Sequence, residues 1–458
     1  MKALSVLLFL FLGLVSAAFP PVRDIYVADW DEPNGHMYVY WTNGGRYSKI
    51  IVRVDALDDS YHDQEEYLGE ATKAHFFGLK TSTQYKISVE AGDKGDYSPW
   101  TTIYWTSPKA SMPPPYWTTR LTGPASQTAA MASVARIPET MESWYIDEDG
   151  SVWGEWYDEG HNQWNRYQLA GPGSASTRSG MAAVSRTSNR MEVFFTSPDG
   201  ALVDCWWTQG DYWKCENRAP PGSVYDTSPI AAVARDKDHV EVWFITPGGG
   251  VMDYFYIEGK GWGSWQFIPE GVVSTSYGGL AAVSRASNTI EVFVTRKDLS
   301  VRDHYWYDGQ DWKDFELAPP NSASGNIRAV SRKSNTMEVW FVGVQGSLED
   351  YYWYDDQPWK HFQLVGPGVV TGVTGLAALS RSSDNMEVFY IAQDESLRCA
   401  RFWEKGGWYH ITLSEAYTVS HASGIGAVSR RSNTLDVYYV NKNNSVEDLS
   451  YTAPHNNW

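Results

Sequence analysis

The chain has 458 residues, which is more than one ordinary domain needs. Its formal net charge of −18 argues against nucleic acid and anionic membrane surfaces as partners, because both attract basic patches. The composition includes 23 Trp and 29 Tyr. Aromatic rings pack cores and also stack on sugars and bases, and in an acidic protein we expect sugars rather than nucleic acid.

Residues 1–18 are predicted to be a secretory signal peptide outside the fold. Lys2 supplies a positive start, residues 4–15 an apolar run, and residues 16–18 ("SAA") small side chains before a cleavage site. The run is short for a bilayer span, and no second apolar run of ~20 residues follows. We therefore expect a secreted, extracellular protein without a transmembrane segment, with an N-terminal membrane anchor as the weaker alternative.

Residues 19–108 show short strands separated by turns, the pattern of an all-β sandwich. The segment resembles a fibronectin type III domain. Trp41 lies where that family has an early-strand core tryptophan, and "GLKTSTQYKISVEA" carries Leu79 and the corner tyrosine Tyr85. The resemblance implies a spacer or adhesion module, and "MPPPY" after it predicts a stiff linker.

From residue 109 onward the chain repeats one phrase with a period of about 49 residues, as in "VSRTSNRMEVFF" and "VSRASNTIEVFV". Each of seven units carries an arginine, an acid six residues or so later, and a closing tryptophan. The arginines are Arg136, Arg186, Arg235, Arg285, Arg332, Arg381 and Arg430. The acids are Glu142, Glu192, Glu241, Glu291, Glu338, Glu387 and Asp436.

Each unit contains four short segments of strand type and no helical periodicity, which predicts the blade of a β-propeller. We therefore expect an all-β protein in which residues 109–458 form a seven-bladed propeller of four-stranded blades. The last unit stops before its fourth strand, and "YWTTRLTGPAS" near residues 116–122 resembles that missing strand. We expect this segment to close the ring, because open sheet edges invite aggregation. A parallel β-solenoid is the architectural alternative, but it leaves the split repeat unexplained.

Alternation along a strand places the acid and the aromatic residue two positions later on one face. The third segment repeats this pattern with Asp and an aromatic residue. Carboxylates accept pairs of hydroxyl hydrogen bonds and rings cover the apolar face of a pyranose, so clefts between blades could bind sugars. The candidate carbohydrate-binding residues are Arg186, Glu192, Asp204 and Trp206 in the second unit, Arg285, Glu291, Asp303 and Tyr305 in the fourth, and Arg332, Glu338, Asp350 and Tyr352 in the fifth.

A structural role for the same residues is the alternative, since the arginines and acids could pair between neighbouring blades and the rings could be core. The units also differ. The sixth has Cys399 and Arg401 where others have Asp and an aromatic residue, the seventh has Ser450, and the third has "ARDKDHVEV" in place of the Ser-Asn phrase. We therefore expect fewer than seven good sites, in units two, four and five.

The cysteines and turns carry further predictions. Cys205 and Cys215 flank a predicted hairpin and could form a disulfide, with free buried thiols as the alternative, while Cys399 would remain unpaired. Asn443 in "NNS" is a possible N-glycosylation acceptor. No cluster has metal-ligand spacing, and we expect neither a metal nor another cofactor.

The repeat "AAVSRxSNxMEVFFxxxDGxLxDxWW" resembles that of bacterial seven-bladed propeller lectins and, more distantly, six-bladed fungal fucose-specific lectins. The resemblance implies multivalent binding of glycans or glycoproteins, often fucosylated, between blades and without catalysis. Asp204 and Asp303 match a third-strand acid of the fucose lectins, but Glu192, Glu291 and Glu338 stand where those lectins have a sugar-holding arginine.

A glycoside hydrolase is the enzyme alternative, and it needs one unique pair of carboxylates. Here each carboxylate has copies elsewhere in the ring, so we expect a lectin and not an enzyme. An extracellular protein-binding or adhesion scaffold is the other alternative.

Overall fold

The computed structural model describes residues 19–31, 36–59, 61–76, 79–80, 83–107, 116–122, 124–128, 130–276, 278–355, 357–371, 375–404 and 406–452. The predicted signal peptide lies outside these residues. The chain divides into two compact units, Met1–Ser111 and Met112–Trp458. Within the described ranges there is no helix long and apolar enough to cross a membrane.

The first unit consists of two antiparallel sheets. One has the order β1 (Arg23–Asp31), β2 (His36–Thr42) and β5 (Lys73–Phe76). The other contains β4 (His62–Leu68), β3 (Lys49–Ala56), β6 (Gln84–Asp93), β7 (Asp96–Tyr97) and β8 (Thr101–Thr106), with β7 and β8 both paired to β6. Apolar residues on one face of each sheet form a single core that includes Trp41, Leu79 and Tyr85.

Tyr85 fixes the connection before β6. Its hydroxyl accepts a hydrogen bond from the N–H of Lys80 at 2.6 Å and donates to the carbonyl of the same residue at 3.2 Å. The buried ring therefore carries its polar end to a backbone segment five residues upstream, which is the arrangement known as a tyrosine corner.

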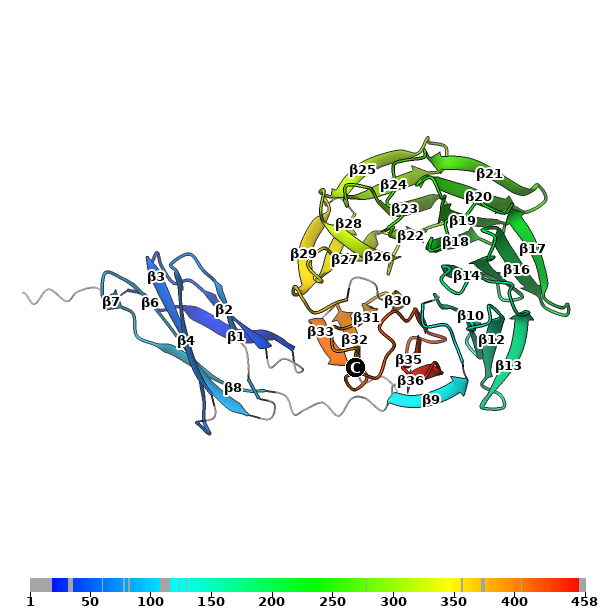
Figure 1. Cartoon of the computed structure of the whole chain (residues 1–458). Coiled ribbons are helices and arrows are strands. Elements are labelled where there is room, and N and C mark those ends of the chain that lie inside the picture. Colours follow the sequence, from blue (N-terminus) through cyan, green and yellow to red (C-terminus); the bar gives the residue numbers. More distant parts are fainter. Residues whose placement is uncertain are drawn as a thin grey trace, which may run out of the picture. The chain divides into compact units, whose positions relative to one another are not determined.

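The second unit contains seven four-stranded antiparallel sheets among its described residues, here numbered one to seven in chain order, in an arrangement consistent with a β-propeller (Figure 1). The strands of sheets one to three are β10 (Ala132–Ile137), β11 (Thr140–Ile146), β12 (Val152–Asp158), β13 (Gln163–Ala170); β14 (Met181–Thr187), β15 (Arg190–Thr196), β16 (Leu202–Thr208), β17 (Lys214–Ala219); and β18 (Ile230–Asp236), β19 (His239–Ile245), β20 (Val251–Ile257), β21 (Gly261–Ile268). Those of sheets four and five are β22 (Leu280–Val283), β23 (Thr289–Thr295), β24 (Val301–Tyr307), β25 (Lys313–Ala318); and β26 (Ala323–Val330), β27 (Thr336–Gly343), β28 (Leu348–Tyr354), β29 (Lys360–Val365). Those of sheets six and seven are β30 (Leu376–Ser382), β31 (Asn385–Ile391), β32 (Leu397–Trp403), β33 (Gly407–Thr412); and β34 (Ile425–Val428), β35 (Thr434–Val440), β36 (Val446–Thr452), β9 (Tyr116–Thr122).

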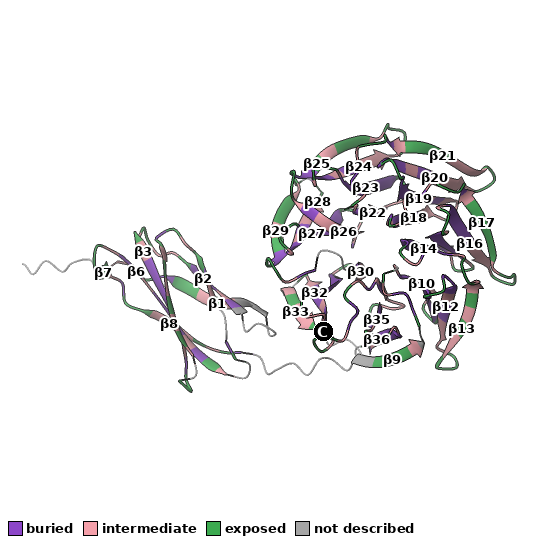
Figure 2. Cartoon of the chain, in the orientation of Figure 1, coloured by how far each residue is buried: buried purple, intermediate pink, exposed green. Residues whose placement is uncertain are grey.

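Burial follows the position of each strand in its sheet (Figure 2). The second strands are almost entirely buried, as in β23, β31 and β35, because both of their faces are covered by neighbouring sheets. The first strands carry small residues such as Ala281 and Gly426, which suit a crowded centre. The fourth strands β17, β25 and β29 are mostly exposed and end in buried residues, and they form the outer rim.

The strand predicted near residues 116–122 pairs as expected. β9 lies antiparallel to β36, with Asp448 opposite Thr119, and it supplies the fourth strand of sheet seven. The first strands of successive sheets contact one another, and β34 of the last sheet contacts β10 of the first. The two ends of the repeat region are therefore held together by main-chain hydrogen bonds.

Candidate carbohydrate-binding site

The repeated arginine and acid form an ion pair inside each of the sheets predicted to bind sugar. The distance between the guanidinium and the carboxylate is 3.2 Å for Arg186 and Glu192, and 3.0 Å for Arg285 and Glu291. The acids lie on second strands covered on both faces, and their side chains are 1% exposed. The corresponding pair of sheet five, Arg332 and Glu338, is 3.6 Å apart and 1% and 2% exposed.

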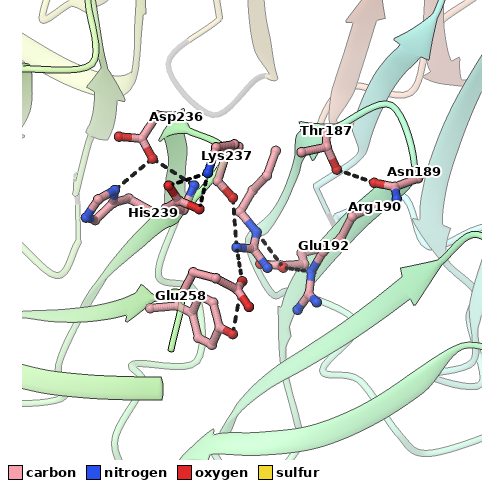
Figure 3. A network of polar contacts seen from close by, with 11 residues as sticks. Thr187, Asn189, Arg190, Glu192, Asp236, Lys237, His239 and Glu258 are labelled. Carbon is pink, nitrogen blue, oxygen red and sulfur yellow. Dashed lines mark hydrogen bonds and ion pairs between the residues drawn. The ribbon is translucent and has the colours of Figure 1, made fainter. Parts of the chain in front are cut away.

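Each of these arginines also contacts the next sheet of the ring. Arg186 donates to the carbonyl of Lys237 at 3.1 Å and its guanidinium lies 4.7 Å from the ring centre of Tyr256. Figure 3 shows this network, with Glu192 bound on its other side by Arg190 and with Glu258 of the neighbouring sheet on Arg186. Five other arginines of the repeat donate a hydrogen bond to a carbonyl of the next sheet in the same way: Arg136 to Ser188, Arg235 to Ser287, Arg285 to Ser334, Arg332 to Ser383 and Arg381 to Ser432.

These contacts give the repeated pair a structural role. The guanidinium neutralises a buried carboxylate of its own sheet, binds the backbone of the next sheet and packs on an aromatic ring there. The residues predicted for sheets two, four and five are therefore brought together as expected, but their charged atoms are covered. Whether any of them binds a sugar stays a prediction.

The third-strand acids are buried as deeply. Asp204, Asp303 and Asp350 have exposed fractions of 1–2% and lie opposite aromatic residues of the second strands. Burial, reinforced by the nearby Glu192, raises the pKa of Asp204 to about 7. Burial and the second-strand glutamates raise the pKa values of Asp303 and Asp350 well above the usual range. These carboxyl groups are core groups that favour the neutral form.

The aromatic partners of these acids are also engaged. In sheet two, Arg218 bonds Asp204 at 2.8 Å and its guanidinium lies 4.9 Å from the ring centre of Trp206. Tyr305 and Tyr352 pack edge-on against the tyrosine two residues later in their own strands. The expected acid-and-ring pairs exist, and the rings contact other residues of their own sheets.

The equivalent residues of sheet three line a cleft of about 170 Å³ against sheet four. Its polar wall is Arg235 on β18, Glu241 on β19 and Asp253 on β20. The pair Arg235–Glu241 is 3.3 Å apart, and its side chains are 14% and 13% exposed, compared with 1–7% in sheets two, four and five. The rings of the cleft are Phe255, Tyr256, Trp265, Trp306 and Trp312.

Two substitutions within the repeat account for this opening. In sheets four and five the last residue of the third strand is a tyrosine, and the hydroxyls of Tyr307 and Tyr354 accept hydrogen bonds from Arg285 and Arg332 at 3.0 Å. Sheet three has Ile257 at that position, which has no hydroxyl to cover the pair.

The second substitution lies at the start of the second strand. Sheet two has Arg190 there, and it covers its glutamate at 2.7 Å. Sheet three has His239 at the same position, and that histidine bonds Asp236 at 2.7 Å instead (Figure 3). The carboxylate of Glu241 is therefore covered by Arg235 alone.

The electrostatics of the cleft combine one cation with two carboxyl groups. Burial raises the pKa of Glu241, and the neighbouring Arg235 opposes that rise. Burial and the charge of Glu241 raise the pKa of Asp253 well above its usual range, while the indole N–H of Trp265 donates to Asp253 at 2.9 Å. The cleft therefore offers a guanidinium donor, a carboxylate acceptor and several ring surfaces, which is a combination that suits a sugar.

The unit that forms this cleft was not among those expected to carry the best sites. The phrase "ARDKDHVEV" weighed against sheet three, yet its histidine does not bond the acid, whose side chain is 13% exposed. Asp253, Phe255 and Trp265 were missed as candidate residues. The sequence signal for this cleft is that His239 and Ile257 replace the residues that cover the arginine–acid pair in other units.

Of the two alternatives that the sequence left open for Cys205 and Cys215, the structure has the disulfide. Cys205 and Cys215 are directly opposed on β16 and β17 and are bonded, while Cys399 is buried and free. Asn443 is exposed in the turn between β35 and β36, and its glycosylation stays a prediction. In the described part of the chain, no group of three or more His, Cys, Asp or Glu could hold a metal ion.

Residues 175–320 and 322–458 match the sequence model of the fungal fucose-specific lectins. The chain belongs to this family. Lectins bind carbohydrates without transforming them, so the family supports carbohydrate binding and identifies a protein that is not an enzyme. The first matched segment contains every residue of the cleft between sheets three and four.

Two solved structures have a similar fold. BP39L lectin from Burkholderia pseudomallei has a TM-score of 0.65 at 19% identity, over 71% of this chain and 96% of that chain. AofleA from Arthrobotrys oligospora has a TM-score of 0.51 at 17% identity, over 66% and 91% of the two chains. A comparison with curated protein sequences gave no match.

A first prediction tests the structural role of the repeated pair. Arg332→Ala leaves Glu338 in the core without its cation, so we expect the free energy of unfolding to fall by ~3–5 kcal/mol. Arg302→Ala is the control, because Arg302 pairs with Asp314 on the outer surface and the expected loss is ~0–1 kcal/mol. Urea unfolding measures both values, and equal losses in the two variants would contradict the role.

A second prediction concerns pH. Because burial raises the pKa of Asp350 in the folded state well above its ordinary value of 3.8, its contribution to stability is present at acidic pH and falls as the pH rises toward the folded value. Asp350→Asn removes this loss, so the variant should gain stability relative to the parent at pH 8 and not at pH 4. Urea unfolding across this range checks it.

The control for the pH experiment is Asp298→Asn. Hydrogen bonds from Ser300 lower the pKa of Asp298, so this variant should not gain stability at pH 8. A loss of stability at pH 8 in Asp350→Asn would show instead that Asp350 is charged and paired.

Proposed function

We propose that the protein is a secreted lectin that binds fucosylated glycans in the cleft between sheets three and four. The observation that carries this proposal is that the repeated arginine and acid are partly exposed there, in a cleft lined by rings, whereas the pairs of sheets two, four and five are covered. The family supports the choice of fucose as the sugar to test.

Different residues of the cleft can contact different groups of a fucose ring. Glu241 can accept hydrogen bonds from a pair of hydroxyl groups, and Arg235 can donate to ring or hydroxyl oxygens. Fucose also carries a methyl group and an apolar C–H face. Trp265 is 39% exposed at the cleft, and its indole offers a surface for that face while its N–H remains on Asp253.

The architecture inferred from sequence extends this proposal. We infer that the seven sheets are the blades of one seven-bladed ring, which the pairing of β9 with β36 and the contact of β34 with β10 support. We further infer a signal peptide at residues 1–18, a fibronectin type III-like domain at 19–108 and the propeller at 109–458. The two-sheet order and the tyrosine corner of Tyr85 support the second assignment.

Multivalent binding is the functional consequence of a repeat only if more than one cleft accepts a glycan. A single site of this kind binds weakly, and several on one rigid ring multiply the apparent affinity for a dense glycan surface. Because the arginine–acid pairs of sheets two, four and five are covered, the number of candidate clefts is smaller than the number of sheets.

The decisive variant is Glu241→Gln, which removes the acceptor charge with little change in shape. We expect its affinity for methyl α-L-fucoside to fall at least about tenfold, the effect of losing ~1.4 kcal/mol of charge-assisted hydrogen bonding. Glu338→Gln is the matched control, because it changes the equivalent residue of sheet five, and we expect no change in affinity. Calorimetric titration of the two variants and the parent protein measures the difference.

Two results of that titration would contradict the proposed site. If Glu338→Gln loses affinity and Glu241→Gln does not, sugar binds at the covered pairs after local opening. If neither variant changes a measurable affinity, the sugar binds elsewhere on the chain.

A further inference from the structure

A cavity of about 190 Å³ lies on the axis of the second unit, apart from the cleft between sheets three and four. Residues from all seven sheets line it, most of them at or just before the start of a first strand. Figure 1 shows these strands facing the centre. No acidic residue is part of its lining, although the chain has a net charge of −18.

One residue of the lining breaks the symmetry of the ring. Arg328 lies on β26 opposite Trp340, and the equivalent positions opposite the second-strand aromatic residues are alanine or glycine in the other sheets. These residues are Ala132, Ala182, Ala231, Ala281, Ala377 and Gly426. A single long cation therefore replaces a small side chain in one of seven repeats.

The guanidinium of Arg328 has little to bind within the protein. It donates to the carbonyl of Ile327 at 2.8 Å, and among the described residues no carboxylate lies within ion-pair distance of it. Burial lowers the pKa of Arg328 to about 10, with no neighbouring charge to raise it, so the group remains a cation at neutral pH. Among the described residues, most of its five N–H donors have no protein partner.

Several other polar groups of the lining already bond within the protein. The hydroxyl of Ser179 donates to the carbonyl of Gly180 at 2.6 Å, and that of Ser423 donates to the carbonyl of Gly424 at 2.6 Å. The backbone N–H groups of Gly180 and Gly375 donate to carbonyls of the next sheet. Arg178, the other cation of the lining, is exposed and paired with Asp226.

We propose that the axial cavity binds a small oxyanion, a sulfate, phosphate or carboxylate group, through the guanidinium of Arg328. A planar guanidinium binds such groups by two parallel hydrogen bonds, and the low-dielectric surroundings strengthen the attraction. A strongly acidic protein does not collect anions without a specific site, so binding depends on this one cation. The proposal is independent of sugar binding between sheets three and four.

The chain itself suggests the test variant. Arg328→Ala installs the residue found at five of the six equivalent positions, so the ring should fold. We expect the full-length parent protein to bind sodium sulfate in a calorimetric titration, and Arg328→Ala to bind it at least about tenfold more weakly. Sulfate should also raise the thermal unfolding midpoint of the parent and not that of the variant, with sodium chloride at equal ionic strength as the blank.

Two further variants keep the result interpretable. Arg302→Ala removes one positive charge from the outer part of sheet four, and it should bind sulfate as the parent does. Arg328→Gln keeps much of the side-chain volume without the charge, and it should behave like Arg328→Ala even if the smaller residue disturbs packing.

The source of the oxyanion is decided by competition. If galactose 6-sulfate or N-acetylneuraminic acid binds more tightly than inorganic sulfate and depends on Arg328, the anion is part of a glycan. If only sulfate binds, it is a free ion. The proposal is overturned if the parent shows no sulfate binding at millimolar concentrations, or if Arg328→Ala binds sulfate as well as the parent. Methyl α-L-fucoside titrated in parallel reports on the proposed lectin site separately.

Discussion

The buried pair of arginine and acid, together with its contact to the next sheet, is the interaction on which the second unit depends. In the first five sheets the guanidinium is held at three points, by a carboxylate of its own sheet, by a carbonyl one sheet further on and by an aromatic ring there. Arg430 makes the last of these contacts with Tyr157, which joins sheet seven to sheet one. A contact repeated in this way sets the spacing of the sheets, and removing one guanidinium leaves an uncompensated charge in the core.

Much of this could be predicted from the sequence. A period of about 49 residues with four strand-like segments in each repeat indicated the sheets, and the missing fourth strand of the last repeat indicated the pairing of β9 with β36. The disulfide followed from the spacing of Cys205 and Cys215 across a hairpin. The strand period and the hairpin disulfide depend on neighbours in the chain. The pairing of β9 with β36 joins distant segments, and it could be predicted because the repeat shows which strand its last unit lacks.

The accessibility of the repeated residues could not be predicted in the same way. A repeat shows which residues recur, and recurrence is expected of structural contacts as well as of binding sites. Whether Glu241 or Glu338 is covered depends on Ile257 or Tyr354 at the end of the third strand, and the residue at the start of the second strand, His239 in sheet three, also matters. The cleft therefore forms where one unit departs from the sequence of the repeat. Arg328 in the axial cavity is another such departure.

The most direct measurement is a crystal structure of the protein with methyl α-L-fucoside. The account predicts a bound sugar in the cleft between sheets three and four, in contact with Glu241 and Trp265, and none at the covered pairs of sheets two, four and five. A sugar held by Glu192, Glu291 or Glu338, with the cleft of sheet three empty, would contradict the division between structural and binding pairs on which the account is built.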